Sequence, residues 1–366
     1  MQSTYQTRGG LWQKLLYRLG ITTNTVVKVY NGFGHARQVQ AFGHVLLQSA
    51  LPRRKWRGNV LRNTWALLRL FMTKPAPAGW ELKGEWQGIA CTAKTDAAGF
   101  FKLEWKDGPE VEPGWHEVTV TLLSGETGVQ GKGRLMIPHS TQHAFVSDVD
   151  DTFLVSHSAH LRKRLWVLFT ENARSRQPFD GSVKHYQLLA QGNTTSDKPN
   201  PFFYVSSSEW NLYDYLHEFV RVQELPQGVY LLNVLKRFSQ IFKTGQNNHG
   251  TKFARIVRII NAYPKQQFVL LGDSSQHDTF IYEALVTHFP GRIAAVYIRD
   301  VYKKNYDKVK DVLNGIAEKG VPVCFFSHSN EAIAHSKNIG LITHAGAQGP
   351  KPTEGPNQPH TTAGVA

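Results

Sequence analysis

The stretch 143-HAFVSDVDDT-152 decides how the second half of the chain folds. Its apolar run Ala144–Val146, typical of a strand buried in a parallel sheet, ends at once in three acids, Asp148, Asp150 and Asp151. Carboxylates this close repel one another, so a cation is expected to hold them together. Ligands of open α/β sheets bind at the carboxyl ends of strands, which is where these acids fall. An isolated acidic turn would look the same, but this one gains partners further along the chain.

From His143 onward, predicted strands alternate with predicted helices. Helical patterns are clearest at Asn211–Val222, Phe253–Ala262 and Thr279–His288. This alternation predicts an α/β domain with a doubly wound parallel sheet over residues 141–342. The expected strands are Ala144–Val146, Phe202–Ser206, Gly228–Asn233, Phe268–Gly272, Ile293–Ile298 and Val321–Phe326.

The part of the chain before this domain has a different rhythm, with short β-rich runs separated by turn residues. It predicts a β-rich, sandwich-like accessory domain over residues 26–140, without a catalytic cluster. Residues 343–366 contain little to bury and are expected to form a disordered tail. The clearest strands of the β-rich part are Val26–Tyr30, Val39–Leu46, Trp80–Trp86, Gly99–Trp105 and Glu117–Leu123.

The net charge of +14 is concentrated near the N-terminus. Residues 1–74 contain twelve Lys and Arg and no Asp or Glu. Such a field attracts an anionic partner, phospholipid or nucleic acid, although a solubilising surface would look the same. Residues 1–25 form a basic amphipathic segment, in which Leu11–Leu19 has helical spacing. That helix could lie on an anionic membrane or pack on its own domain, and the pattern leaves both open.

Several features of the sequence bear on location. No run of apolar residues is long enough for a membrane-spanning helix, and the first twenty residues lack the order of a secretory signal. Cys91 and Cys324 are the two cysteines of the chain, which favours a reducing compartment. We therefore expect a cytoplasmic location, with peripheral attachment to the inner membrane face as a further expectation.

The polar residues that follow the later strands suggest a chemistry. The second strand ends in Ser206 and Ser207. Ser207 would replace Ser206 as the polar residue at the strand end if the strand ended one residue later. Lys252 precedes a predicted helix, and Asp273 and Asp278 follow the fourth strand. Carboxylates, hydroxyl and ammonium together fit a magnesium-assisted attack on phosphate, in which an Asp takes the phosphoryl group and a second acid protonates the leaving oxygen.

Five motifs resemble one phosphatase family. They are SDVDDT, ENARSRQPFDG, FFYVSSSEWNLYDYL, GDSSQHDTFIYEAL and VYIRDV. Their order resembles the haloacid dehalogenase superfamily, and more closely the actin-patch-protein type of magnesium-dependent phosphatidate phosphatase and its bacterial relatives. The resemblance covers residues 141–327 and extends more loosely over the β-rich part. It implies a haloacid-dehalogenase-type catalytic domain preceded by the β-rich one.

The resemblance also implies roles for individual residues. Asp148 would be the nucleophile, Asp150 the general acid and base, and Thr152 would steady the substrate loop. Ser206 (or Ser207) would bind phosphate, and Lys252 would bridge phosphate and nucleophile. The Mg²⁺ ligands implied are Asp148, Asp150, Asp273 and Asp278.

The predicted reaction is hydrolysis of phosphatidate to diacylglycerol and phosphate, with anionic phospholipid at a membrane surface as partner. Nucleic acid is the less favoured partner, and the sequence leaves the oligomeric state and the acyl preference open. One alternative is a phosphatase of a soluble phosphomonoester or phosphoprotein. The other is a protein that binds membrane or nucleic acid and in which catalysis is incidental. A basic insertion between the first two motifs could contact lipid headgroups or form an ordinary solvated face: Arg162, Lys163, Arg164, Arg174 and Arg176.

Overall fold

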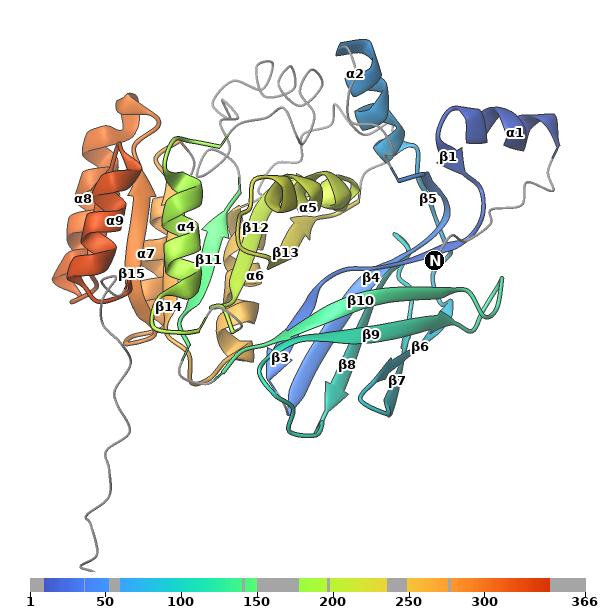
Figure 1. The fold of residues 1–366 in the computed structure, drawn as a ribbon, viewed down its shortest axis with the longest axis horizontal. Coiled ribbons are helices and arrows are strands. Elements are labelled where there is room, and N and C mark those ends of the chain that lie inside the picture. The colour runs from blue at the N-terminus through green and yellow to red at the C-terminus, as the bar shows by residue number, and fades with distance from the viewer. Residues whose placement is uncertain are drawn as a thin grey trace, which may run out of the picture.

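The computed structural model describes residues 10–35, 37–52, 60–139, 142–149, 178–195, 198–235, 249–275 and 278–342. Asp150, Thr152, the basic insertion and the predicted tail lie outside these residues. No helix in the described ranges is long and apolar enough to cross a membrane. A β-rich part comes first and an α/β part follows it, as Figure 1 shows.

The β-rich part forms a ten-stranded sheet arranged around one long strand, β4 (Gln38–Ala50). β4 pairs antiparallel with β1, β2, β3, β5 and β8, and β10 pairs parallel with β3. The five strands expected from the sequence are present with shifted ends. The other strands are β1 (Ile21–Thr22), β2 (Val26–Val29), β3 (Gly32–His35), β5 (Lys74–Pro75), β6 (Glu81–Trp86), β7 (Ile89–Lys94), β8 (Phe100–Lys106), β9 (Gly114–Leu122) and β10 (Gln130–Ile137).

Strict alternation of side chains explains the core of this part. In β6 and β8, buried and outward-facing residues alternate, so apolar side chains point inward and charged ones outward. Trp86 and Trp105 meet edge to face inside, with ring centroids 6.3 Å apart. On the outside, Lys83 pairs with Glu85 at 2.6 Å. This is the ordinary partition of a soluble protein.

The α/β part contains a six-stranded sheet in which every neighbouring pair is parallel. Its order is β13-β12-β11-β14-β15-β16, so the chain builds outward from β11 first on one side and then on the other. The predicted α/β class and the parallel sheet are confirmed. The strands are β11 (Ala144–Asp148), β12 (Phe202–Glu209), β13 (Gly228–Asn233), β14 (Phe268–Asp273), β15 (Ile293–Arg299) and β16 (Val323–Phe326).

Helices cover this sheet, with α4, α5 and α9 on the near side in Figure 1 and α6 and α7 behind it. The three helical patterns named from the sequence correspond to α5, α6 and α7, and no bounds were predicted for α4, α8 and α9. The helices of the α/β part are α4 (Ser182–Gln191), α5 (Tyr213–Val222), α6 (His249–Ala262), α7 (Asp278–His288), α8 (Tyr306–Glu318) and α9 (Ser329–Asn338), with short 3-10 turns η2 (Trp210–Leu212) and η4 (Lys303–Asn305).

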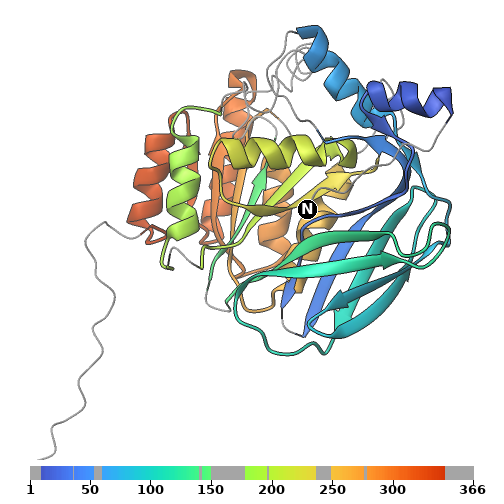
Figure 2. The ribbon, with the colours of Figure 1, turned by 45° about the vertical axis from the view of Figure 1, so that its right-hand side comes forward.

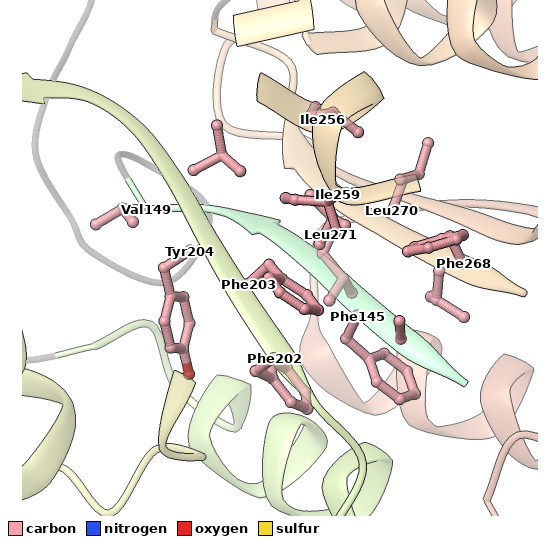
Figure 3. Packing of buried hydrophobic residues seen from close by; sticks show 14 of the residues in the cluster. Phe145, Val149, Phe202, Phe203, Tyr204, Ile256, Ile259, Phe268, Leu270 and Leu271 are labelled. Carbon is pink, nitrogen blue, oxygen red and sulfur yellow. The ribbon is translucent and has the colours of Figure 1, made fainter. Parts of the chain in front are cut away.

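The central strands of the parallel sheet are apolar on both faces because both faces are covered. Phe145 stacks on Phe202 with ring centroids 4.9 Å apart. Figure 3 shows Ile256 and Ile259 of α6 against Leu271 of β14, and all three are buried. This core fixes the strands whose carboxyl ends carry the predicted site.

Some buried residues of the β-rich part, among them Tyr30 and Phe33, join the hydrophobic core of the α/β part, and a second cluster lies within the β-rich part alone. Tyr30 stacks on Trp210 at 4.2 Å between ring centroids, and Phe33 meets Phe203 at 5.5 Å. The side chain of Asn31 donates a hydrogen bond of 2.9 Å to the carbonyl of Gly228. Figure 2 shows the β-rich sheet lying against the α/β part. The β-rich part therefore supports the strand that carries Ser206.

Candidate active site

The carboxyl ends of two neighbouring strands bring two carboxylates together. Asp148 is the last residue of β11 and Asp273 is the last residue of β14, and these strands pair in parallel. Both side chains are buried, with exposed fractions of 1% and 0%. β12 and β14 lie on either side of β11, so the chain reverses its winding direction here, where ligands of such sheets bind.

Two helices add a lysine and a third carboxylate at the same edge. Lys252 lies in the first turn of α6, and Asp278 is the first residue of α7. Lys252 Nζ donates a hydrogen bond of 2.8 Å to Asp148 Oδ1 and a second, shorter one to Asp278 Oδ1. The structure thus joins four predicted site residues, although Lys252 and Asp148 are 104 positions apart.

The electrostatics of the cluster follow from its burial. Burial acts to lower the pKa of Lys252, but the carboxylates of Asp148 and Asp278 outweigh it and raise that pKa, so the ammonium stays charged at neutral pH. Burial, followed by the nearby Asp278, raises the pKa of Asp273 to about 8. The backbone N–H of Ser275, 2.6 Å from Asp273 Oδ1, opposes that rise.

The donor set fits a divalent cation. Oxygen atoms of Asp148, Asp273 and Asp278 lie within 4.8 Å of one another. Among the described residues, Asp273 Oδ2 and Asp278 Oδ2 are buried and have no hydrogen-bond partner. One ammonium leaves two negative charges uncompensated when all three acids are ionised. Carboxylate oxygens without partners are the ligands that a hard ion such as Mg²⁺ prefers.

The predicted phosphate-binding serines lie one strand away. β12 pairs with β11 so that Val205 is opposite Asp148, which puts Ser206 one residue beyond the acid. Ser206 is buried and its hydroxyl accepts a hydrogen bond of 2.9 Å from the backbone N–H of Ser208. Ser207 is half-buried. β12 continues to Glu209, further than expected, with an irregular register after Val205.

Some supporting residues were not predicted. The Ser147 hydroxyl donates a hydrogen bond of 2.7 Å to the backbone carbonyl of Asp148 and lies 2.9 Å from the Tyr186 hydroxyl. It therefore fixes the backbone at Asp148. The sequence signal that could have indicated this role is the polar Ser147 within the otherwise apolar strand AFVSD. Gly272 is required because a Cβ there would lie 2.9 Å from Asp278 Oδ2. Asp150 and Thr152, predicted as acid/base and loop residue, lie outside the described residues.

A mostly apolar cavity of about 210 Å³ lies beside the serine strand. Arg255 connects the two sites, because it lines the cavity and also donates a hydrogen bond of 3.0 Å to the carbonyl of Ser206. Arg258, one turn further along α6, lines the cavity as well. Its apolar walls come from both parts of the chain and include Phe42, Ala98, Phe100, Trp210, Leu231, Leu232, Val234 and Leu235.

The fold and this site place the protein in the class of α/β proteins that have buried carboxylates and a lysine at the carboxyl ends of the strands of a parallel sheet. Residues 143–300 match the family model described as "Phosphatidate phosphatase APP1, catalytic domain". The match bears out the family resemblance of the motifs over this part of the chain.

Two curated relatives each match less than half of the chain. Phosphatidate phosphatase APP1 of Saccharomyces cerevisiae is 29% identical over 155 residues, which are 42% of this chain and 25% of that protein. An uncharacterized protein of Schizosaccharomyces pombe is 23% identical over 160 residues, or 43% of this chain and 25% of that protein. The match therefore spans a quarter of the length of each relative.

Two solved structures illustrate a weak resemblance to this chain. A carbohydrate acetylesterase from Xanthomonas citri aligns over 76% of this chain and 68% of its own, with a TM-score of 0.27 and 9% identity. An immunoglobulin-like domain of the M. primoryensis ice-binding adhesin aligns over 31% of this chain and 96% of its own, with a TM-score of 0.16 and 14% identity. Similarity at this level carries no argument about fold or function.

Proposed function

We propose that the chain is a Mg²⁺-dependent phosphomonoester hydrolase that releases diacylglycerol and phosphate from phosphatidate. One observation carries the proposal: Asp148, Lys252, Asp273 and Asp278 meet at the sheet edge, within the segment that matches the catalytic domain of a phosphatidate phosphatase. When bound by Asp148, Asp150, Asp273 and Asp278, Mg²⁺ would reduce the repulsion between these acids and a phosphate dianion.

The first step transfers the phosphoryl group to the protein. A carboxylate oxygen of Asp148 attacks phosphorus, the P–O bond to the lipid breaks, and its electron pair leaves with the lipid oxygen. Asp150, in the role that the family resemblance implies, gives that oxygen a proton. Lys252 keeps the attacking carboxylate oriented through its 2.8 Å hydrogen bond, and its charge opposes the negative charge of the phosphate.

The second step removes the phosphoryl group with water. Water attacks the phosphorus of the aspartyl phosphate while Asp150 takes a proton from it. The bond between phosphorus and Asp148 breaks, which releases inorganic phosphate and regenerates the carboxylate. In both steps the hydroxyl of Ser206 (or Ser207) would hold an equatorial phosphoryl oxygen, where the charge of the transition state is spread.

The cavity favours a lipid over a soluble substrate. A phosphate bound near Ser206 would lie beside Arg255, which also lines the apolar cavity of about 210 Å³. A sugar phosphate or a phosphopeptide would gain little from these walls, whereas an acyl chain would remove them from water. A protein that only binds membrane or nucleic acid would gain nothing from a buried Lys252–Asp148 pair, which is costly to desolvate.

The finer architecture belongs to the same proposal. We assign the α/β part to the haloacid-dehalogenase type because its acids follow β11 and β14 and its lysine begins α6, in the order of that superfamily's motifs. We assign the β-rich part to a sandwich-like accessory domain, supported by the apolar cluster around Leu82, Trp86 and Trp105. Action in the cytoplasm, at the inner membrane face, completes the proposal.

Phosphate release tests the function directly. Wild type and Asp148→Asn would be compared on phosphatidate in mixed micelles and on a soluble aryl phosphate, each with and without Mg²⁺. Mg²⁺-dependent release that favours phosphatidate and is lost in the variant is the expected result. Release from the aryl phosphate alone would retain the mechanism and overturn the lipid substrate. No release from either, with Mg²⁺ bound, would favour the binding protein.

A further inference from the structure

Two short helices carry most of the large apolar side chains that the described part of the chain exposes. The exposed fraction is 88% for Leu11 and 68% for Trp12 on α1 (Leu11–Arg18), and 78% for Leu61 on α2 (Val60–Leu68). We call this surface the α1/α2 face. Its members are Leu11, Trp12, Leu15, Leu19, Val60, Leu61 and Trp65.

These side chains form one surface and not scattered positions. Leu11, Leu15 and Leu19 follow one another at a spacing of four, which aligns them along one side of α1. Where that row ends, Trp65 Nε1 donates a hydrogen bond of 3.1 Å to the carbonyl of Leu19. Leu61 lies one turn before Trp65, so the row continues along α2. Both helices project from the same end of the β-rich part in Figures 1 and 2.

The inner sides of the helices are already used for packing. α1 buries Leu16, and α2 buries Asn63 and Leu67. Leu67 packs with Phe71 and Leu212 in a small separate cluster. A surface helix normally turns its apolar side inward and its polar side to water. Here both helices are anchored on the inside and still present apolar side chains outward, which is typical of an interaction surface.

The charges beside the α1/α2 face select the kind of partner. Lys14 and Arg18 on α1 and Arg62 on α2 are exposed. The sequence has twelve Lys and Arg and no acid over residues 1–74, which contain both helices. Apolar side chains flanked by cations complement an anionic bilayer, where the chains enter the acyl boundary and the cations meet headgroups.

The α1/α2 face lies on the catalytic side of the molecule. In Figure 1 the arrowhead of β11, the strand that ends at Asp148, points to the side from which α2 projects. A direct link exists as well, because the side chain of Asn211 in η2 donates a hydrogen bond of 2.9 Å to the carbonyl of Leu70, just after α2. η2 follows β12, the strand of Ser206. A bilayer on this face would thus meet the edge of the sheet that carries the acids.

We propose that the α1/α2 face docks the protein on the surface of an anionic phospholipid bilayer, with both helices at the interface. The inference deepens the proposed function and rests on it in one respect, the reason for docking. A docked chain would find its proposed substrate, phosphatidate, in the same bilayer. Docking itself requires no turnover, so the two can be tested separately.

The experiment measures co-sedimentation of the full chain with vesicles of phosphatidylcholine alone or mixed with phosphatidylglycerol. Phosphatidylglycerol is anionic but is no phosphomonoester, so binding cannot report the catalytic site. We expect binding to the mixed vesicles that weakens with salt, and binding at least about tenfold weaker for Trp12→Ser/Leu61→Ser. Lys14→Glu/Arg18→Glu should weaken it as well. Hydrolysis of a soluble aryl phosphate should be unchanged in each variant.

A matched control uses apolar side chains that are exposed elsewhere. Leu123 and Tyr306 are 44% and 42% exposed and lie on other elements, so Leu123→Ser/Tyr306→Ser should bind vesicles as wild type does. Equal binding by Trp12→Ser/Leu61→Ser and wild type would overturn the proposal. So would no binding of wild type to the mixed vesicles, or self-association of wild type through this face. Unchanged vesicle binding with no phosphatase activity would instead reject the proposed function alone.

Discussion

Two regions of this protein depart from the usual partition of residues, in opposite directions. The carboxyl edge of the parallel sheet buries charge, with Asp148, Asp273 and Asp278 at 1% exposure or less. The α1/α2 face exposes apolar side chains, with Leu11 and Leu61 more than three-quarters accessible at 88% and 78%. Between them, β6 and β8 keep the ordinary arrangement, apolar inside and charged outside.

The difference shows where the molecule is incomplete by itself. Buried carboxylates are costly without a cation, and exposed apolar groups are costly in water. Neither arrangement stabilises the isolated chain, so each favours a binding partner that offsets the cost. In our proposals these partners are an anionic substrate with a metal ion at the acids and a lipid surface at the α1/α2 face. Substitutions in each region can measure the free-energy cost of the buried carboxylates and of the exposed apolar side chains, and can show whether the same residues are needed for activity or binding.

The largest expected effect concerns Asp148, the proposed nucleophile. Asp148→Asn keeps the size of the side chain and removes its nucleophilic carboxylate, so turnover of phosphatidate should fall by about 10⁴-fold or more. Steady-state phosphate release measures it. Asp214→Asn is the control, because Asp214 is an exposed carboxylate that pairs with Lys28 at 2.7 Å. Comparable losses in both variants would contradict the assignment.

The next effect concerns the stability of the buried ion pair. Lys252→Met leaves Asp148 and Asp278 without their shared cation, so the free energy of unfolding of the metal-free protein should fall by about 3–5 kcal/mol. Lys28→Met breaks the partly exposed pair with Asp214 and should cost about 1 kcal/mol or less. Urea denaturation compares the two variants. Equal costs would mean that the acid cluster is not held by Lys252.

A third variant should stabilise the protein by removing a buried charge. The pKa of Asp273, raised by burial to about 8, lies above its unfolded value, so ionisation of Asp273 removes stability as pH rises toward 8. In EDTA, Asp273→Asn should therefore gain about 2 kcal/mol or more over wild type at pH 9, and close to nothing at pH 4. Unfolding curves at both pH values measure it. A gain that is independent of pH would refute this explanation, and the variant should lose Mg²⁺-dependent turnover.

A smaller effect concerns the cavity beside the serine strand. Ala98→Trp adds an indole to its wall, to which Asp148, Asp273 and Asp278 do not contribute. Turnover of long-chain phosphatidate should fall by about tenfold, which is the expected size for lost apolar contacts of a few methylenes. Turnover of an aryl phosphate is the internal control and should not change. Parallel losses on both substrates would show that the cavity does not receive the acyl chain.

The smallest expected effect distinguishes exposed from buried leucine on one helix. Leu11→Ser should change the free energy of unfolding by no more than about 0.5 kcal/mol, because Leu11 is 88% exposed. Leu16→Ser, on the buried side of α1, should cost about 2 kcal/mol or more. Thermal unfolding in the absence of lipid measures both. A large loss for Leu11→Ser would mean that this face packs within the protein.

Much of the α/β part could be predicted because its strands are uniformly apolar. Gly228–Asn233 was predicted with its observed ends, since β13 is a continuous apolar run between turn residues. α8, in which Val309, Leu313 and Ile316 have helical spacing and are buried, lies between the last two predicted strands, where the alternation predicted a helix without giving its bounds. In the β-rich part, β4 is longer than the predicted Val39–Leu46 because it pairs with several partners along its length, and this is a tertiary cause that no local pattern contains.

The site was predicted from motif order, and its geometry was not. Lys252 lies 104 positions from Asp148, so only the fold brings the two together. Ser147 is adjacent to the predicted nucleophile but has its partner Tyr186 39 positions away, which explains why its supporting role could not be seen in the sequence. The exposure of Trp12 and Leu61 could not be predicted either, because spacing alone does not say which side of a helix packs.

The aromatic contacts between the β-rich and α/β parts have a consequence for the evolution of this protein. The family match ends at residue 300, yet the edge strand β16 of the sheet lies beyond it. Before it, Tyr30 packs against Trp210 and Phe33 against Phe203. The segment that matches the family model is thus smaller than the unit that folds. A recombinant fragment of residues 143–300 should be insoluble, and domain shuffling would have to carry both sides of the Tyr30–Trp210 stack together.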